Sequence, residues 1–375
     1  MKIVYIANIR IPTEKAHGVQ IMKMCEAFSR LYPLELVAPT KKDIHISDKD
    51  PFSYYGVEES FSIKKLRSID PHWLMKFPQG VYIKFQILFF LVRVFFYLIF
   101  LKNKDDIIFY TRDEYMLPLL LRFSKKVIWE AHTMPKNAKY YARYWKQCAR
   151  IIAITGYLKN ELVDLGLEEK KMQIESDGVD IKKFGAYFDK EANRKKFGLP
   201  LDKTVVLYTG HLYDWKGAHT LAQACDNLPS SYICAFVGGT KNDIKKFTEK
   251  YKDKKNMIIM GHVPHENIPA YLSTADMLVI PNSAKSNISK FYTSPMKFFE
   301  YLSTDKPILA SDLPALREVG DKFSGVYYCI PDNAEDLSKK IQAIDTKKIY
   351  TRDLAKFSWD ERSKRIVEFI NTSAI

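Results

Sequence analysis

One stretch, residues 291–320, limits what this chain can fold into more than any other part of its sequence. Its pattern predicts a helix over Pro295–Leu302, with Ser294 as the N-cap residue and a proline at the first helical position. A polar turn follows, and the apolar run Ile308–Ala310 then predicts a short buried strand. A helix, a buried strand and a polar loop would therefore meet around one carboxylate, that of Glu300.

The predicted helix and its carboxylate suit a ligand that carries both phosphate and sugar. Free N–H groups and the positive end of the helix dipole near Ser294, Pro295 and Met296 could hold a phosphate or a sugar hydroxyl. The carboxylate of Glu300, further along the helix, could accept two hydrogen bonds from a vicinal diol such as ribose. One module would then hold a sugar nucleotide at both ends, although an ordinary α/β unit has the same outline.

This stretch resembles the donor-site signature of the retaining glycosyltransferases of family 4, which have the GT-B fold. In that family a helix carries two glutamates separated by seven residues, and a G/D-K-P-[IV]-[VIL]-A-[ST]-D pattern follows. Glu300 matches the second glutamate and Asp305–Asp312 match the tail, whereas Tyr292 stands where the first glutamate is usual. The tyrosine implies a different donor sugar, a shifted alignment or weakened catalysis.

The composition favours a large protein with anionic partners. The chain has 375 residues, 47% of them hydrophobic, which is enough for two domains with substantial cores. Lys and Arg exceed Asp and Glu by 58 − 44 = 14, so phosphorylated substrates, acidic lipid headgroups and nucleic acid are all candidate partners. No nucleic-acid reading motif is recognisable, and donor and lipid phosphates explain the charge equally well, so no nucleic-acid partner is expected.

The cysteines and the first residues of the chain favour a cytoplasmic protein. The five cysteines are scattered, odd in number and without metal-ligand spacing, so we expect reduced thiols and no metal site among them. The opening run Lys2–Ala7 predicts a buried strand rather than a signal peptide. We therefore expect a cytoplasmic location.

The first half of the chain predicts a doubly wound α/β domain. Apolar runs at residues 2–7, 107–110, 127–129 and 151–154 predict parallel strands with helices between them. Ligands of such domains bind at the carboxyl ends of the strands. The resemblance implies that the glycine turn after the first strand faces the donor phosphates and that a histidine after a later strand lies beside the transferred sugar. The donor-side candidate is Gly18, and the acceptor-side candidates are His17, Arg112 and His132.

The most apolar segment is Phe85–Leu101, which is flanked by Lys84 and Lys102. Its seventeen residues are short for a membrane span, and Arg93 at the centre is a costly charge there. A helix this apolar on all sides is either enclosed in the core or laid on a membrane surface. We therefore expect plain burial, peripheral contact with an anionic membrane at its cytoplasmic face, or a homodimer contact.

The second half repeats the α/β pattern and carries further motifs of the family. The strand at residues 204–208 is followed by Gly210-His211 and then Lys216-Gly217, which resemble the G-R-L…K-G motif whose two cations neutralise the departing diphosphate. Here His211 replaces the arginine. A later G-x-V-P turn is expected under the nucleotide base. The donor-binding residues implied in this half are Gly210, His211, Lys216, Gly238, His262, Val263, Tyr292, Ser294, Pro295, Met296 and Glu300.

The resemblance implies an α/β architecture of two Rossmann-like doubly wound domains that face each other across a cleft. Residues 1–185 would bind the acceptor, residues 186–355 would bind the nucleotide sugar, and residues 356–375 would form a helix that crosses back to the N-terminal domain. The polar, lysine-rich run Asp180–Pro200 is expected to be the linker.

The implied reaction transfers a sugar from a UDP- or GDP-sugar to a hydroxyl acceptor, with retention at the anomeric carbon. The expected acceptor is a cell-surface polysaccharide or glycolipid precursor, and the implied catalytic residues are His132, Lys216 and Glu300. No metal or other cofactor is expected, because no Asp-x-Asp is placed at a strand end. A catalytically weakened partner subunit and a sugar-nucleotide 2-epimerase of the same fold are the alternatives.

Overall fold

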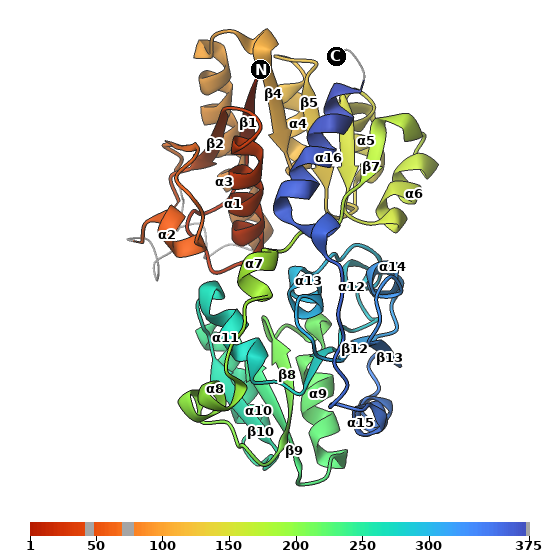
Figure 1. The fold of residues 1–375 in the computed structure, drawn as a ribbon. Coiled ribbons are helices and arrows are strands. Elements are labelled where there is room, and N and C mark those ends of the chain that lie inside the picture. Colours follow the sequence, from red (N-terminus) through yellow and green to blue (C-terminus); the bar gives the residue numbers. More distant parts are fainter. Residues whose placement is uncertain (42–48, 70–78, 373–375) are drawn as a thin grey trace. The chain divides into compact units, whose positions relative to one another are not determined.

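The computed structural model of the protein describes residues 1–41, 49–69 and 79–372, and the chain forms two compact units. Unit 1 contains Met1–Ser176 and the segment that begins at Trp359, and unit 2 contains Asp177–Ser358. Figure 1 shows that each unit is a sheet with helices packed on it. The chain therefore changes unit at 176/177 and at 358/359, whereas the sequence predicted boundaries at 185/186 and 355/356.

Unit 1 is built on a seven-stranded parallel sheet of order β3-β2-β1-β4-β5-β6-β7. The strand order reverses between β1 and β4, which pair in parallel with Tyr5 opposite Tyr110. Every residue of β4 and β5 is buried, as expected for central parallel strands that are covered on both faces. The strands are β1 (Lys2–Ile6), β2 (Leu34–Pro39), β3 (Ser62–Leu66), β4 (Ile107–Thr111), β5 (Val127–Ala131), β6 (Arg150–Ala153) and β7 (Met172–Ile174).

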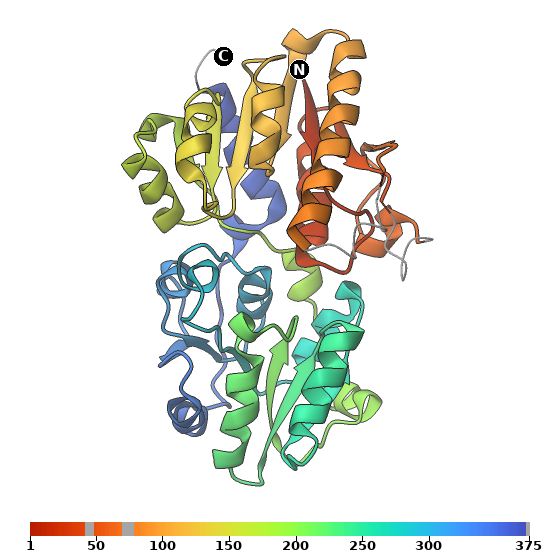
Figure 2. The ribbon, with the colours of Figure 1, turned by 180° about the vertical axis from the view of Figure 1, so that it is seen from behind.

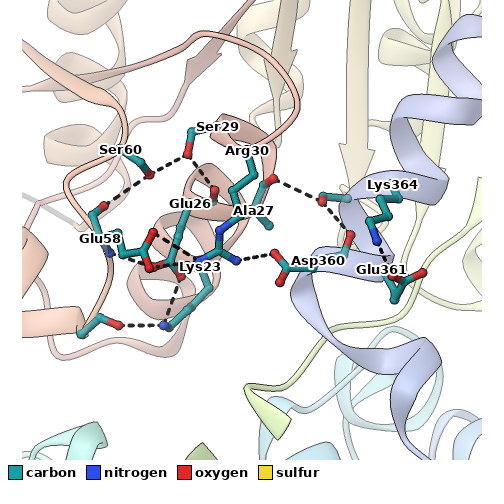
Figure 3. Close-up of polar contacts among 12 residues, drawn as sticks. Lys23, Glu26, Ala27, Ser29, Arg30, Glu58, Ser60, Asp360, Glu361 and Lys364 are labelled. Atoms are coloured by element: carbon teal, nitrogen blue, oxygen red, sulfur yellow. Dashed lines mark hydrogen bonds and ion pairs between the residues drawn. The ribbon is translucent and has the colours of Figure 1, made fainter. Parts of the chain in front are cut away.

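Helices cover both faces of this sheet. Helices α1 and α16 lie on the face turned forward in Figure 1, and α3 and α4 lie on the face turned forward in Figure 2. The α1–α16 contact is partly polar, because Arg30 Nη1 lies 2.5 Å from Asp360 Oδ1 (Figure 3). Ser363 Oγ also donates to the Ala27 carbonyl at 3.4 Å. The helices are α1 (Ala16–Ser29), α2 (Pro51–Tyr55), α3 (Gln79–Phe100), α4 (Leu117–Leu120), α5 (Ala138–Trp145), α6 (Gly156–Asp164) and α16 (Trp359–Asn371).

Helix α3 contains the apolar segment, and the structure buries only one of its faces. Phe90, Val94 and Leu98, spaced four residues apart, are fully buried, and the neighbouring Tyr97 hydroxyl donates to Glu35 Oε1 on β2 at 3.0 Å. By length and composition alone, α3 is the one helix in the described part of the chain that could cross a membrane, and most of it is exposed. Its large exposed apolar side chains are Ile83, Phe85, Leu88, Val92, Phe95, Phe96, Ile99 and Phe100.

Unit 2 is built on a six-stranded parallel sheet of order β10-β9-β8-β11-β12-β13. Alternate residues of the strands enter two cores, one with α11, α13 and α14 and one with α9, α10 and α15. The strands are β8 (Thr204–Thr209), β9 (Tyr232–Val237), β10 (Met257–Gly261), β11 (Met277–Ile280), β12 (Ile308–Ser311) and β13 (Val326–Cys329). The helices are α7 (Ile181–Phe184), α8 (Lys190–Phe197), α9 (Ala218–Ala224), α10 (Lys241–Tyr251), α11 (Ile268–Ser273), α12 (Asn287–Phe291), α13 (Met296–Leu302), α14 (Pro314–Gly320) and α15 (Ala334–Ala343).

Two local predictions were wrong. The run 180–200 is not a linker, because it forms α7 and α8 inside unit 2, where buried Arg194 pairs with Asp276 at 2.6 Å. Helix α13 begins at Met296 with Pro295 as its N-cap residue, and Ser294 does not cap it. The hydroxyl of Ser294 instead accepts a hydrogen bond from the Asp177 N–H at 2.8 Å. Sequence patterns cannot reveal such a long-range use of a serine.

Candidate functional site

The loops that follow β8 and β11 meet where the strand order of unit 2 reverses. Gly217 has a φ of +72°, and a Cβ atom there would lie 1.6 Å from the Pro281 carbonyl oxygen, so the position requires glycine. The Ser283 N–H donates to the Trp215 carbonyl at 3.0 Å, which ties the two loops together. In doubly wound sheets, ligands bind at the carboxyl ends of the strands beside such a reversal.

Two lysines approach this edge of the sheet from different elements. Lys216 follows β8, and its Nζ lies 4.1 Å from the centroid of the Trp215 ring. Its ammonium group forms no hydrogen bond or ion pair with any residue that the structure describes. Lys297, in the first turn of α13, is 9% exposed. Its Nζ donates to the Thr209 carbonyl at 3.3 Å and lies 4.1 Å from the centroid of the Tyr208 ring.

The environment disfavours the positive charge of both lysines. Burial lowers the pKa of Lys216 to about 8, with Asp177 opposing the shift. Burial holds the pKa of Lys297 well below its usual value; Lys216 lowers it further, and Glu300 opposes the shift. Because a buried cation is costly without a counter-charge, this edge of unit 2 favours an anionic ligand.

The turn after β10 contacts the carboxylate that the sequence singled out. Glu300 is 6% exposed, and its Oε1 lies 2.7 Å from His265 Nε2. The His265 ring in turn lies 5.5 Å from the Phe184 ring, measured between centroids. Within the same turn, His262 is exposed and Val263 packs against the core. The carboxylate is therefore held on one oxygen, while its Oε2 has no hydrogen-bond partner among the described residues.

Two predicted donor contacts near β8 have defined surroundings. The His211 ring is stacked on the Tyr213 ring, with centroids 4.9 Å apart. Gly238 has a φ of +117°, and a Cβ atom there would lie 2.5 Å from the Gly210 carbonyl oxygen. The loops after β8 and β9 can therefore approach each other only because residue 238 is a glycine.

The side chains of the segment before α13 are mostly buried. Tyr292, which takes the place of the family's first glutamate, is 8% exposed and follows α12. Ser294 is buried and engaged with the Asp177 backbone. Pro295 contributes no N–H, so Met296 is the first residue of α13 that can offer one.

Asn282, at the end of β11, is a polar residue that the sequence did not single out. It is fully buried, and neither amide atom finds a hydrogen-bond partner in the described part of the chain. Its backbone N would lie 3.2 Å from a Cβ atom at Gly217. Buried polar groups without partners are rare and costly, so Asn282 is a further candidate for ligand contact.

A second polar cluster lies within unit 1, around Glu130 at the end of β5. This carboxylate is fully buried, and its Oε1 lies 2.8 Å from His132 Nε2 and 3.0 Å from Arg362 Nη2 of α16. Gln20 Nε2 donates to the same oxygen at 3.1 Å, and the Tyr110 hydroxyl donates to Oε2 at 2.5 Å. The predicted catalytic histidine is therefore fixed through one ring nitrogen by a carboxylate.

The charges of this cluster are set by burial and by two arginines. Burial and the nearby Arg112 lower the pKa of His132 to about 4, so the imidazole is neutral at pH 7. Burial alone would raise the pKa of Glu130, but Arg362, His132 and Arg112 outweigh it and hold this pKa well below its usual value. Arg112 also donates to the side-chain oxygen of Gln20, so it is part of the same network.

Gly18 has a packing role that its sequence context did not suggest. A Cβ atom there would lie 2.3 Å from the Tyr55 hydroxyl oxygen and 2.8 Å from Thr13 Cγ2. The same hydroxyl accepts a hydrogen bond from the Thr13 N–H at 2.7 Å. The adjacent His17 is exposed on α1. A donor contact by Gly18 and an acceptor contact by His17 stay predictions.

The structure thus groups the predicted site residues by unit. In unit 2, Lys216 lowers the pKa of Lys297 and Glu300 raises it. In unit 1, His132 and Arg112 belong to the polar network around Glu130. No cluster of three or more metal-ligating side chains occurs in residues 1–41, 49–69 and 79–372. The site residues that sequence reasoning missed are Lys297, His265, Asn282, Glu130 and Arg362.

Comparison with known sequences adds evidence for unit 2. The model of a family described as Glycosyl transferases group 1 matches residues 189–358. TuaC of Bacillus subtilis (strain 168), named as a teichuronic acid biosynthesis glycosyltransferase, is 25% identical over 219 residues, which are 58% of this chain and 52% of TuaC. The processive diacylglycerol alpha-glucosyltransferase of Acholeplasma laidlawii is 28% identical over 170 residues, which are 44% and 48% of the two chains. This chain spans about half the length of the curated relatives it matches.

Solved structures resemble the whole chain. The Anabaena protein HepE in complex with UDP matches with a TM-score of 0.74 and 13% identity over 100% of both chains. Sucrose-phosphate synthase from Thermosynechococcus elongatus matches with a TM-score of 0.69 and 15% identity over 99% of this chain and 95% of the other. These likenesses confirm the predicted GT-B fold. The family match and the names of the relatives support a transferase enzyme.

Proposed function

We propose that this protein is a retaining glycosyltransferase of family 4 that moves a sugar from a UDP- or GDP-sugar to a hydroxyl acceptor. One observation carries the proposal: within the segment that matches the glycosyltransferase family, Lys297 of α13 donates to the Thr209 carbonyl at 3.3 Å, at the start of the loop that carries Lys216, and the same helix carries the buried Glu300. Such an edge suits a ligand with a diphosphate at one end and a ribose diol at the other. The UDP bound to HepE supports a uridine nucleotide as the first choice.

In this proposal the protein works mainly by electrostatics. Lys216, assisted by His211, stabilises the negative charge that develops on the leaving diphosphate. Glu300 accepts hydrogen bonds from the ribose, and His262 and Val263 lie against the base. His132, which burial keeps neutral, contacts the sugar or the acceptor. The remaining proposed donor contacts are Gly18, Gly210, Gly238, Tyr292, Ser294, Pro295 and Met296, and no metal takes part.

A thermal-shift panel of UDP, GDP and ADP tests the donor site. A ligand that binds only the folded protein raises its melting temperature in proportion to the logarithm of ligand concentration over Kd. We expect one nucleotide to raise the melting temperature of the wild type and of Glu335→Ala, which removes an exposed carboxylate of α15. We expect Glu300→Ala to lose this shift. If no nucleotide shifts the wild type, the weakened partner subunit becomes the better reading.

The stereochemical part of the proposal needs a separate test. Proton NMR of the first product formed from an α-linked UDP-sugar distinguishes axial from equatorial anomeric protons by their coupling constants. Retention predicts an α-linked product. A β-linked product would contradict the family-4 assignment while leaving the transferase proposal intact, and release of an epimerised sugar would favour the 2-epimerase.

We also propose that the acceptor is lipid-linked or part of a cell-surface glycan, and that the enzyme works peripherally at the cytoplasmic face of an anionic membrane. The exposed apolar face of α3 supports this, together with an apolar pocket of about 300 Å³ lined by residues of α3 and α4, including Val92, Phe95 and Leu119. Lys84 and Arg93 are exposed on the same helix. Diacylglycerol and teichuronic acid in the names of two relatives point to the same acceptor class.

Vesicle sedimentation tests the membrane contact. We expect the protein to bind phosphatidylglycerol-containing vesicles at low salt and to bind pure phosphatidylcholine weakly, because basic side chains add attraction to anionic surfaces. Phe95→Glu should abolish binding, whereas Ile349→Glu, at a 72% exposed position in unit 2, should not. Equal binding by both variants would contradict the proposal. A Phe95→Glu variant that dissociates a dimer without affecting vesicle binding would identify α3 as a subunit interface.

A further inference from the structure

At the proposed diphosphate site, the residue in the place of the motif's arginine carries less positive charge than an arginine would. The motif usually supplies an arginine and a lysine, and this chain has His211 and Lys216. A histidine offers less fixed positive charge than an arginine near neutral pH. The His211 ring is also stacked on Tyr213. A site that must stabilise a departing diphosphate therefore needs charge from another residue.

Lys297 lies where it can supply that charge. Its Nζ would be 3.8 Å from a Cβ atom at Gly210, so it lies over the start of the loop that carries His211 and Lys216. Gly210 has no side chain between this ammonium group and the loop. In the described part of the chain, the contacts of Lys297 Nζ are the Thr209 carbonyl and the Tyr208 ring, and no carboxylate lies within ion-pair distance.

This arrangement is costly for a lysine that has only a structural role. A buried ammonium group is normally paired with a carboxylate, because desolvation is expensive. Here one neutral carbonyl and one aromatic face replace that partner, and the loop's Lys216, which lowers the pKa of Lys297, has the same sign. Burial disfavours the positive charge of both lysines, and a bound anion would favour it.

We infer that Lys297 contacts the diphosphate of the nucleotide donor and, together with Lys216, provides the positive charge that the motif's missing arginine would provide. This inference rests on the proposed function. It also explains why α13 is central to the site. Lys297 and Glu300 are three residues apart and therefore neighbours on one helix surface. One short helix would recognise the phosphate end and the ribose end of the same nucleotide.

The inference predicts different defects for the two residues of α13. UDP and UMP share the base and the ribose, and UDP has one more phosphate, so the ratio of their Kd values isolates the contribution of that phosphate. We expect Lys297→Met to weaken UDP binding at least tenfold and UMP binding less, so that the preference for UDP shrinks while the contribution of Lys216 remains. Glu300→Ala should weaken both nucleotides to a similar degree and preserve the ratio. Calorimetric titration of each variant measures both constants, with GDP and GMP replacing the uridine pair if the thermal-shift panel selects guanosine.

Three further variants make the test specific. Lys297→Gln keeps a donor for the Thr209 carbonyl without the charge, and we expect it to behave like Lys297→Met. If the glutamine variant restores the wild-type ratio, the lysine serves only that hydrogen bond and the inference is wrong. His211→Asn should change the ratio less than threefold, and a larger loss than that of Lys297→Met would return the second contact to His211. Lys245→Met, on the exposed face of α10, should leave both constants unchanged.

The outcomes separate the inference from the proposed function. If the wild type binds UDP more tightly than UMP and both Lys297 variants keep this preference, the donor site stands and the role of Lys297 is refuted. If the wild type binds no nucleoside diphosphate, the proposed function itself fails. Thermal melting of each variant without nucleotide verifies that it is folded.

Discussion

Gly217 fixes the position of the neighbouring Lys216, and its surroundings allow a clean test of that role. A side chain at residue 217 would have an unfavourable positive φ, and its Cβ atom would clash with the Pro281 carbonyl. Gly198 also has a positive φ, of +69°, but no atom lies within 4 Å of its Cβ position. Gly198→Ala therefore measures the backbone cost alone, which is about 1 kcal/mol.

We predict that Gly217→Ala destabilises the protein by clearly more than Gly198→Ala, because the loop must shift away from Pro281. We also expect it to weaken UDP binding, since Lys216 moves with the loop. Denaturant titration and nucleotide titration of both variants provide the measurement. Equal stability and equal UDP affinity in the two variants would show that the loop adapts without affecting the site.

His132 makes the stability of unit 1 sensitive to acid. The pKa of His132 is lowered from 6.5 to about 4 by folding, so the unfolded chain binds a proton in this interval and the folded protein does not. The contribution of the neutral His132 to the free energy of unfolding is therefore fully present above pH 6.5, and it is lost as the pH falls from 6.5 towards 4. We predict a loss of about 2 kcal/mol between pH 7 and pH 5 from this group, at about 1.36 kcal/mol per pKa unit.

Amide hydrogen exchange of β5 at pH 7 and pH 5 measures this loss locally, after correction for the intrinsic rates. His132→Gln should be less stable at pH 7 but should lack most of the pH dependence in this interval. A variant with the same pH dependence as the wild type would show that another group is responsible. Glu130 adds its own loss at lower pH, because its pKa is also held below its usual value.

At the scale of elements, α16 is held to the rest of unit 1 by ion pairs of very different strength, one to α1 and one to β5. Arg30 and Asp360 form an exposed pair, with 41% and 48% of their side chains accessible, and Figure 3 shows them bridging the two helices. Arg362 and Glu130 form a buried pair, with 1% and 0% accessible. Exposed pairs contribute little, whereas removal of one partner of a buried pair leaves an uncompensated charge.

We therefore predict that Arg30→Ala costs at most about 1 kcal/mol and that Arg362→Met costs about 3 to 5 kcal/mol. Adding Glu130→Gln to Arg362→Met should recover much of the loss, since the charge left behind is then removed. Denaturant unfolding of the three variants measures these differences. A loss for Arg362→Met no larger than that for Arg30→Ala would mean that solvent reaches Glu130.

The strands were the easiest elements to predict, and the site was only partly predictable. The apolar runs around Phe109 and Ile128 are continuous because central parallel strands are buried on both faces. Glu300 was found because it belongs to a local pattern. Lys297 was missed because a lysine inside the apolar run of residues 296–302 looks like a break in an amphipathic pattern. The only two charged residues of that helix, Lys297 and Glu300, are three residues apart and therefore neighbours on its surface. This spacing could have identified Lys297 as a site residue together with Glu300.

Other features depend on partners far away in the sequence. Arg362 lies in a helix rich in charged residues and gives no local sign of burial, because its partner Glu130 is more than 200 residues earlier. Ser294 precedes a helix as a cap would, but its partner is Asp177. The sequence of α3 also could not predict that only one of its faces is buried, because this depends on which other elements pack against the helix. Residues 42–48 and 70–78, which include Trp73, Lys76 and Phe77, lie outside the described residues.

For the whole molecule, the division into two units predicts a localised response to nucleotide. We expect UDP to slow amide exchange mainly in unit 2, at residues 209–217 and 282–300, because the proposed donor contacts cluster there. Exchange mass spectrometry with and without UDP measures this, with ADP as the control nucleotide. Slowing spread evenly over both units, or its absence from these segments, would contradict the proposed site. The amides of residues 8–18 report separately on the predicted donor contact of Gly18.

The discontinuity of unit 1 in the sequence has a consequence for synthesis. A chain emerging from the ribosome completes the seven strands of unit 1 first, but α16 with Arg362 arrives only after all of unit 2 has been made. Until then Glu130 lacks its ion pair with Arg362, and the surface of α1 that α16 covers is open to water and to chaperones. Unit 2 is continuous and needs nothing from later translation. Unit 2 is therefore the first unit that can complete its fold, although its synthesis begins second.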